Sequence, residues 1–396
     1  MLTPLAVIGG ATGLTLALAW LGQGRLATKD GEGTRFKGIT ALRAFAALGV
    51  VASHTMATSP LAGLPRLFVE NMATGVALFF VISGFLLYRP FANSLTDRSR
   101  VKIWHFALNR ALRIVPLYFL AVLIVFLATW DRSDQSLLRL AHALTFTGVE
   151  TSGDLIPVAW SLDDEMAFYL LLPVLYLVLM AWPKPQQRLW LGVFVIGALS
   201  LLSLATLAMT PSDQAITGGP LTKFHLFGFG MLLGSFRSRW PQYEPSTRAL
   251  VIGGAGILVL LTASGLAYDR HMYVFSPLCG LAFFLVVGTV AFSGKAATVP
   301  KALSWRPLVF LGDVSYGIYL WHEPIHHVLF NSGLLSSSYI PGLLELACCT
   351  VALATGTYFA IEKPALRIKN RWTVSAGSRR MGRAVSIAQP KGASAA

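Results

Sequence analysis

The chain has 396 residues, of which 55% are hydrophobic and only 13% carry a charge, and its mean hydropathy is +0.62. Soluble domains average about 25% charged residues, so this composition excludes an ordinary soluble protein and predicts a polytopic membrane protein. The net charge of +14 would suit a nucleic-acid-binding protein, but residues 89–113 carry +5 of it and residues 362–396 carry +7. Such clustering is typical of cytoplasmic loops in a membrane protein, so we expect no nucleic-acid partner.

Eleven apolar segments are long enough to cross a hydrocarbon core about 30 Å thick, which takes about 20 helical residues. They are residues 3–22, 38–57, 71–90, 104–128, 157–181, 189–209, 220–236, 249–267, 272–292, 307–330 and 340–361. The sequence therefore predicts an all-α bundle of about eleven transmembrane helices.

The loops between these segments differ in charge, and this predicts the orientation. The loop from Asp131 to Asp154 has four acids against two bases, whereas the loops near 89–103 and 237–248 are basic. Because basic loops stay in the cytoplasm, eleven spans place the N-terminus outside and the C-terminus inside. The first segment lacks a basic leader and a small-residue cleavage site, so we expect a retained helix. The Ser-, Gly-, Ala- and Arg-rich residues after Arg371 are expected to be disordered.

Two ionisable residues, Arg43 and His54, interrupt the second apolar segment. They are eleven positions apart. At about 100° per residue this spacing is within roughly 20° of three full turns, so both side chains lie on one helix face. Along the axis they are about 16 Å apart. An ionisable residue within a membrane helix is costly and by default marks a functional site.

The predicted orientation indicates toward which side of the membrane each of the other polar residues lies. Arg110 and Arg113 lie toward the cytoplasm, whereas Glu165 and His322 lie toward the opposite side. An anionic ligand from the cytosol could therefore meet an acid–base site that serves the outer face.

Six blocks of the sequence resemble, in order, the signatures of the integral-membrane acyltransferase-3 family. They are RAFAALGVVASH (43–54), FFVISGFLLYRP (79–90), RALRIVPLY (110–118), WSLDDEMAFYLLLP (160–173), LGDVSYGIYLWHEPI (311–325) and YFAIEKP (358–364). The resemblance covers about residues 36–370 and implies a core of ten membrane helices. Residues 1–35 would then add an extra helix with a basic loop, and residues 371–396 would form a basic cytoplasmic tail.

The resemblance also implies an enzyme of the inner membrane that O-acylates extracytoplasmic glycans or the sugars of natural products. The donor would be acyl-CoA, most often acetyl-CoA, used as a substrate and not as a tightly bound cofactor. The acceptor would be a glycan, a lipid-linked sugar or a glycosylated small molecule, as in cell-envelope polysaccharide O-acetylation. Where many members have paired glutamates, this chain has Glu165 followed by Met166, so the roles of the preceding Asp163 and Asp164 stay open.

Arg43 and His54 are expected to divide the chemistry. Acyl transfer to a hydroxyl needs a general base, and an imidazole with a free pKa of about 6.5 suits that task, so we assign it to His54. The alternative for His54 is a hydrogen bond between helices. The resemblance implies that Arg43 binds the phosphates or the thioester carbonyl of acyl-CoA, both of which a guanidinium can bind. Its alternative is a structural ion pair or a snorkelling side chain.

Glu165 is the second predicted catalytic residue. A carboxylate in apolar surroundings needs a partner, and we expect it to pair with a histidine, or else to make a purely structural hydrogen bond. Ser83, beside Gly84, also fits close helix packing, and His322 fits either an acceptor site or packing. The predicted substrate-binding and acyl-CoA-binding residues are Arg43, Arg110, Arg113, Ser83, Tyr316 and His322.

Two motif matches are rejected. Residues 322–326 satisfy HExxH, but Pro324 strains the helix that a zinc site needs and no third ligand stands out, so no metal is expected. Residues 228–234 lack the spacing of a dinucleotide fingerprint, and Gly230 and Gly234 instead predict a close contact between helices.

The sequence thus favours a membrane O-acyltransferase with His54 as general base, acting directly or through an acyl-enzyme. The alternative is a secondary transporter in which Arg43 and His54 form a substrate or proton path, although no internal repeat supports it. A non-enzymatic scaffold would leave the shared register of these two residues unexplained.

Overall fold

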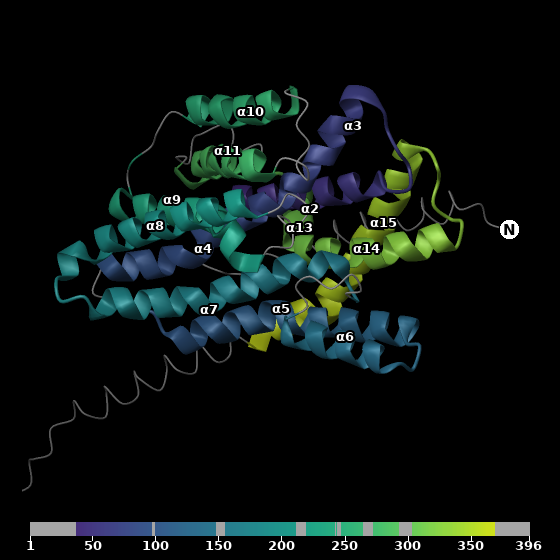
Figure 1. Cartoon of the computed structure of the whole chain (residues 1–396), viewed down its shortest axis with the longest axis horizontal. Helices are drawn as coiled ribbons and strands as arrows, with labels where there is room; N and C mark the ends of the chain where they lie inside the picture. The colour runs from purple at the N-terminus through teal and green to yellow at the C-terminus, as the bar shows by residue number, and fades with distance from the viewer. Residues whose placement is uncertain are drawn as a thin grey trace, which may run out of the picture.

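Figure 1 shows the computed structural model of the chain, a bundle in which most helices run along the longest axis. The structure describes residues 37–96, 100–147, 155–210, 219–241, 243, 247–263, 272–292 and 303–368. Every regular element in these ranges is helical, so the predicted all-α class is confirmed for them. The predicted segment at 3–22 and the predicted tail after Arg371 lie outside the described residues.

Most of the helices follow the predicted apolar segments. The helices are α2 (Lys37–Thr55), α3 (Gly63–Glu70), α4 (Gly75–Thr96), α5 (Ile103–Thr129), α6 (Asp134–Thr145), α7 (Trp160–Ala181), α8 (Arg188–Met209), α9 (Gly219–Arg239), α10 (Thr247–Ala263), α11 (Met272–Phe292), α13 (Arg306–Asp313), α14 (Ser315–Asn331) and α15 (Tyr339–Thr357). Short helical turns precede three of them: η1 (Asn71–Thr74), η2 (Pro157–Ala159) and η3 (Pro185–Gln187). A π-helical turn, η4 (Tyr358–Glu362), continues α15.

Seven of the described helices are long and apolar enough to cross a membrane. These seven contain α2, α4, α5, α7, α8, α11 and α15. The remaining predicted spans in the described ranges are shorter or more polar. Helices α10 and α14 have 17 residues each, and α9 buries Lys223 and His225.

The predicted span at 307–330 is not one helix. It divides into α13 and α14 at Val314, whose φ of −91° and ψ of 4° leave the α-helical region. Helix α13 packs against α2 so closely that a Cβ atom at Gly312 would collide with the carbonyl oxygen of Thr40. Glycine at 312 thus permits the contact that fixes α13, and with it the start of α14, against α2.

Glycines also permit the close contact of α4 with α9. A Cβ atom at Gly84 would collide with the carbonyl oxygen of Phe227, and one at Gly230 would collide with that of Val81. The close packing expected at Gly84 and Gly230 is therefore confirmed. Gly234 lies at an ordinary contact distance, since its Cβ atom would be 3.5 Å from the carbonyl oxygen of Phe85.

A buried ion pair joins α7 to α9. The Nζ atom of Lys223 lies 3.1 Å from Oδ2 of Asp164, with side-chain exposures of 3% and 1%. The Lys223 ammonium also lies 5.0 Å from the ring centroid of Trp160. Asp164, whose role the sequence left open, is thus a partner of Lys223 in the helix packing.

The acidic loop after α5 contains α6, which the sequence analysis did not predict. Ser133 caps α6, because its side-chain oxygen accepts a hydrogen bond from the Ser136 N–H at 3.1 Å. The Ser133 and Ser136 hydroxyls and the Ser133 N–H all donate to Asp131, and these bonds lower the pKa of that carboxyl. A short capped helix therefore organises this loop.

Candidate active site

A cavity of about 80 Å³ lies where α2, α4, α5, α7 and α14 meet. It is lined by Arg43, Phe79, Ile82, Ser83, Leu86, Leu87, Arg110, Arg113, Ile114, Glu165, Tyr169 and Tyr316. Six of the eight predicted site residues come together here, although five different helices contribute them. The other two, His54 and His322, form a separate pair.

The three arginines at this cavity differ in their partners. Arg113 forms an ion pair with the buried Glu362, with Nη1 3.0 Å from Oε2. Arg113 also donates from Nη2 to the carbonyl oxygen of Asp313 at 3.2 Å, which caps the end of α13. Both terminal nitrogens of Arg113 therefore have a partner within the protein.

Arg43 and Arg110 keep donors for a ligand. Arg43 makes no hydrogen bond or ion pair with any described residue, and Nε of Arg110 is buried without an acceptor among them. Burying guanidinium donors without acceptors is costly, so side chains in this state favour an anion or a carbonyl oxygen as ligand. The Tyr316 hydroxyl is already bonded, since it donates to the Ile114 carbonyl oxygen at 3.0 Å.

Glu165 is not paired with a histidine, and that expectation was wrong. It lines the same cavity as Arg110 and Arg113, so the expectation that it lies toward the opposite side of the membrane from these arginines was wrong as well. Its Oε1 atom accepts a hydrogen bond from the Ser83 hydroxyl at 2.7 Å, and its Oε2 atom accepts one from the Tyr169 hydroxyl at 2.5 Å. Glu165 thus bonds to α4 through Ser83 and within α7 through Tyr169, whereas His54 on α2 and His322 on α14 bond to each other. Ser83, next to the close-packed Gly84, is therefore also a hydrogen-bond donor to Glu165.

His54 and His322 are in direct contact. Nε2 of His322 lies 3.0 Å from Nδ1 of His54, and the ring centroids are 5.0 Å apart. Nδ1 of His322 lies 2.6 Å from the carbonyl oxygen of Tyr319. The His322 ring is fully buried, whereas His54 is only partly buried.

These contacts define which nitrogen of His54 is available. A carbonyl oxygen only accepts, so Nδ1 of His322 carries the hydrogen. In a neutral His322 ring, Nε2 is then an acceptor, and Nδ1 of His54 must donate to it. The lone pair of His54 is consequently on Nε2, which makes no hydrogen bond with any described residue. The arrangement presents Nε2 of His54 as a base.

Two aromatic rings lie between the cavity and the histidine pair. Phe79, which lines the cavity, makes an edge-on contact with Tyr319 at a centroid distance of 6.0 Å. The Tyr319 ring in turn lies 5.8 Å from the His322 ring. The sequence analysis assigned no role to Phe79 or Tyr319, although both lie in blocks that it quoted.

Polar contacts hold α14 against the start of α7. The Tyr319 hydroxyl donates to the Val158 carbonyl oxygen at 2.8 Å, and Ser161 donates to the Tyr319 oxygen at 2.8 Å. The Val158 N–H donates to Oε2 of Glu323 at 2.9 Å. Glu323 thus anchors the backbone beside the histidine pair.

The two histidines of the HExxH match face different partners. His322 bonds to His54, whereas Nε2 of His326 lies 3.0 Å from the Thr58 hydroxyl. No group of three metal-binding side chains occurs among the described residues.

The sequence is similar to those of known acyltransferases. Residues 36–361 match the model of Acyl_transf_3, described as an acyltransferase domain. The exopolysaccharide production protein ExoZ of Rhizobium meliloti is 30% identical over 317 residues, which are 77% of this chain and 93% of ExoZ. The O-acetyltransferase OatA of Staphylococcus aureus is 24% identical over 355 residues, which are 83% of this chain and 56% of OatA. The chain thus spans little more than half the length of OatA, and no solved structure gives a significant match.

Proposed function

The chain belongs to the Acyl_transf_3 family of acyltransferases and crosses the membrane several times, and on this premise we propose that it transfers an acyl group from acyl-CoA to a sugar hydroxyl. The names of its relatives support an O-linked product: OatA is an O-acetyltransferase, and ExoZ is an exopolysaccharide production protein. Acetyl is the acyl group that these names favour, and a glycan, a lipid-linked sugar or a glycosylated metabolite is the acceptor.

One observation carries the proposal. A single helix, α2, contributes both Arg43 and His54. Arg43 lines the cavity and its guanidinium donors have no acceptor among the described residues, whereas His54 belongs to the histidine pair. The two residues are eleven positions apart, which corresponds to about 16 Å of helix, so a bound donor must be extended to reach from one to the other. Acyl-CoA is such a molecule, with phosphates at one end and the thioester at the end of a long arm.

The cavity provides the donor site in this proposal. Arg43 and Arg110 bind phosphate or carbonyl oxygens, because their donors lack acceptors among the described residues. Arg113 keeps a structural role through Glu362 and adds positive charge at the cavity. Glu165, the one acidic residue among those that line the cavity, holds Ser83 and Tyr169 in place beside the arginines.

The histidine pair provides the base. Nε2 of His54 takes the proton of the acceptor hydroxyl while the hydroxyl oxygen forms a bond to the thioester carbonyl carbon. The carbon–sulfur bond then breaks, and the thiolate of CoA receives the proton from Nε2. His322 is a positioning residue, because its Nε2 atom accepts the Nδ1–H bond of His54 both before and after His54 is protonated.

We place this site in a chain of eleven spans with its N-terminus outside and its C-terminus inside, in the inner membrane. Residues 36–370 form the acyltransferase domain, residues 1–35 add a helix, and residues 371–396 form a cytoplasmic tail. This orientation brings the arginines to the cytoplasmic half, where acyl-CoA is available, and the histidines to the outer half.

The test is transfer of radiolabel from acetyl-CoA in membranes that contain the wild type or His54→Ala, with extracted glycans and a cell extract as acceptors. Label transferred by the wild type and lost in His54→Ala supports the proposal. If the wild-type protein is folded but transfers label to none of the acceptors, whichever acyl-CoA is offered, the result contradicts the proposal. It would favour the transporter alternative, in which Arg43 and His54 form a substrate or proton path.

A further inference from the structure

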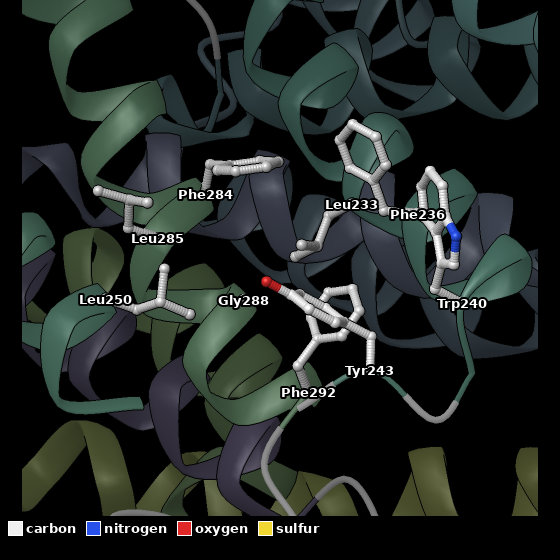
Figure 2. Close-up of a pocket in the computed structure, with 9 residues that line it drawn as sticks. All are labelled: Leu233, Phe236, Trp240, Tyr243, Leu250, Phe284, Leu285, Gly288 and Phe292. Atoms are coloured by element: carbon white, nitrogen blue, oxygen red, sulfur yellow. The ribbon is translucent and has the colours of Figure 1, made fainter. Parts of the chain in front are cut away.

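A second and larger cavity lies away from the candidate active site, at the end of α9 where it meets α10 and α11. Its volume is about 430 Å³, within the range of roughly 300–1,000 Å³ that is usual for ligand sites. Figure 2 shows the residues that line it: Leu233, Phe236, Trp240, Tyr243, Leu250, Phe284, Leu285, Gly288 and Phe292. None of them lines the arginine cavity.

The walls of this cavity are almost entirely hydrocarbon. Figure 2 shows the Tyr243 ring lying across the space with its hydroxyl oxygen toward Gly288. Gly288 keeps its side of the cavity open, because an added Cβ atom would meet only Leu233 Cδ1, at 3.4 Å. An apolar space of this size loses dispersion contacts if it stays empty, so it favours an aliphatic occupant.

Positive charge lies at the rim of this cavity. The Arg237 guanidinium lies over the Phe292 ring, with Cζ 5.4 Å from the centroid. The Arg239 guanidinium lies over the Trp240 ring at 5.7 Å. Both rings belong to residues that line the cavity. A hydrocarbon chain inside would therefore have its polar end beside two cations.

Exposed tryptophans indicate the level of the rim in a bilayer. Trp182, Trp190 and Trp240 are 42%, 49% and 42% exposed, and the Trp190 and Trp240 rings lie 6.1 Å apart. Tryptophan concentrates at the boundary between hydrocarbon and headgroups. The arginines are thus at headgroup depth, and the cavity is at the depth of the acyl chains.

The geometry points to a site for one acyl chain of an anionic phospholipid, whose phosphate lies beside Arg237 and Arg239. The positive charges of Arg237 and Arg239 favour an anionic headgroup over that of a lipid without net charge. The two cavities share no lining residue and no helix, because this one is formed by α9, α10 and α11, whereas the arginine cavity is formed by α2, α4, α5, α7 and α14. This site is independent of the proposed acyl transfer.

The test uses the full chain in nanodiscs with phosphatidylglycerol that carries a diazirine in one acyl chain. After irradiation, mass spectrometry should find adducts concentrated on residues 233–243 and 284–292. In Gly288→Leu, whose side chain fills the cavity, we expect these adducts to fall by about tenfold, which corresponds to about 1.4 kcal/mol of binding. Leu250→Trp fills the cavity from α10 and should act in the same way if Gly288→Leu folds poorly.

Gly256→Leu is the matched control, because a Cβ atom at Gly256 meets nothing within 4 Å and the labelling should not change. Excess unlabelled phosphatidylglycerol should compete better than phosphatidylcholine, and Arg237→Gln with Arg239→Gln should remove that preference. Adducts spread evenly over the outer helices, equal competition by the two lipids in the wild type, or displacement by long-chain acyl-CoA in preference to phosphatidylglycerol would each overturn the proposal.

Discussion

Nε2 of the buried His322 lies 3.0 Å from Nδ1 of His54, while Nδ1 of His322 donates to the backbone at Tyr319. This contact assigns the hydrogen of His54 to Nδ1 and leaves Nε2 as the basic atom. It also joins α14 to α2 beside the segment that α7 contributes to the site. The position of His322 therefore determines whether His54 can act as a base.

His322→Leu should lower kcat by about 10- to 100-fold, less than the roughly 10²–10⁴-fold that a general base itself contributes. The Michaelis constant for the acyl donor should stay near the wild-type value, because the arginine cavity is unchanged. His322→Gln keeps an acceptor for the His54 N–H and should recover part of the loss. A purely structural role would instead predict similar losses of kcat and thermal stability in both variants.

Arg43→Ala and Arg113→Ala should fail in different ways. Arg43 makes no hydrogen bond or ion pair with a described residue, so its loss should raise the Michaelis constant for the donor by about 10- to 100-fold and leave stability unchanged. Arg113→Ala leaves the buried Glu362 carboxylate unpaired and should cost roughly 3 kcal/mol of stability. Thermal unfolding in detergent and donor titrations distinguish the two. Equal unfolding temperatures for both variants would contradict this division.

The Asp164–Lys223 ion pair should matter for stability and not for transfer. Asp164→Leu leaves the buried Lys223 ammonium without its carboxylate partner and should cost about 3–5 kcal/mol, whereas Asp164→Leu with Lys223→Met should be close to the wild type. The measurement is thermal unfolding of Asp164→Leu, of Lys223→Met and of the double variant that combines them. A folded Asp164→Leu that bound donor but transferred no label would instead make Asp164 part of the catalytic site.

Gly84→Ala should destabilise the protein by about 1–3 kcal/mol, because its methyl group meets the Phe227 carbonyl oxygen in a contact that cannot widen without separating α4 from α9. Gly197→Ala is the matched control. A Cβ atom there meets nothing within 4 Å, so the same change should be neutral or stabilising by up to about 1 kcal/mol. Equal effects of the two changes on the unfolding temperature would show that the close contact does not limit stability.

Much of the fold follows from hydropathy alone. Runs of apolar residues predicted most of the helices from α2 to α15. The spacing of Arg43 and His54 predicted that both lie on one face of their helix, and both lie near residues of α14: Arg43 lines a cavity with Tyr316, and His54 contacts His322. The division at Val314 escaped prediction, because it depends on the contact of Gly312 with Thr40. Helix α6 was missed because its loop was classified by charge.

The sequence predicted most of the residues that form the site, but it did not predict which of them contact each other. Six of the eight predicted residues line one cavity, because a membrane interior tolerates few polar side chains and these gather together. Which of them touch depends on helix rotation, which one sequence does not give. Glu165 therefore bonds to Ser83 and Tyr169 and not to a histidine.

The central claim is that the donor binds at Arg43 and that His54 performs the chemistry. The most direct measurement is equilibrium binding of labelled acetyl-CoA to the purified wild type, His54→Ala and Arg43→Ala in nanodiscs, alongside transfer to an acceptor that the wild type uses. We predict that His54→Ala binds acetyl-CoA as the wild type does and transfers none of it, whereas Arg43→Ala binds it weakly. Loss of binding in His54→Ala, or wild-type binding in Arg43→Ala, would contradict the account.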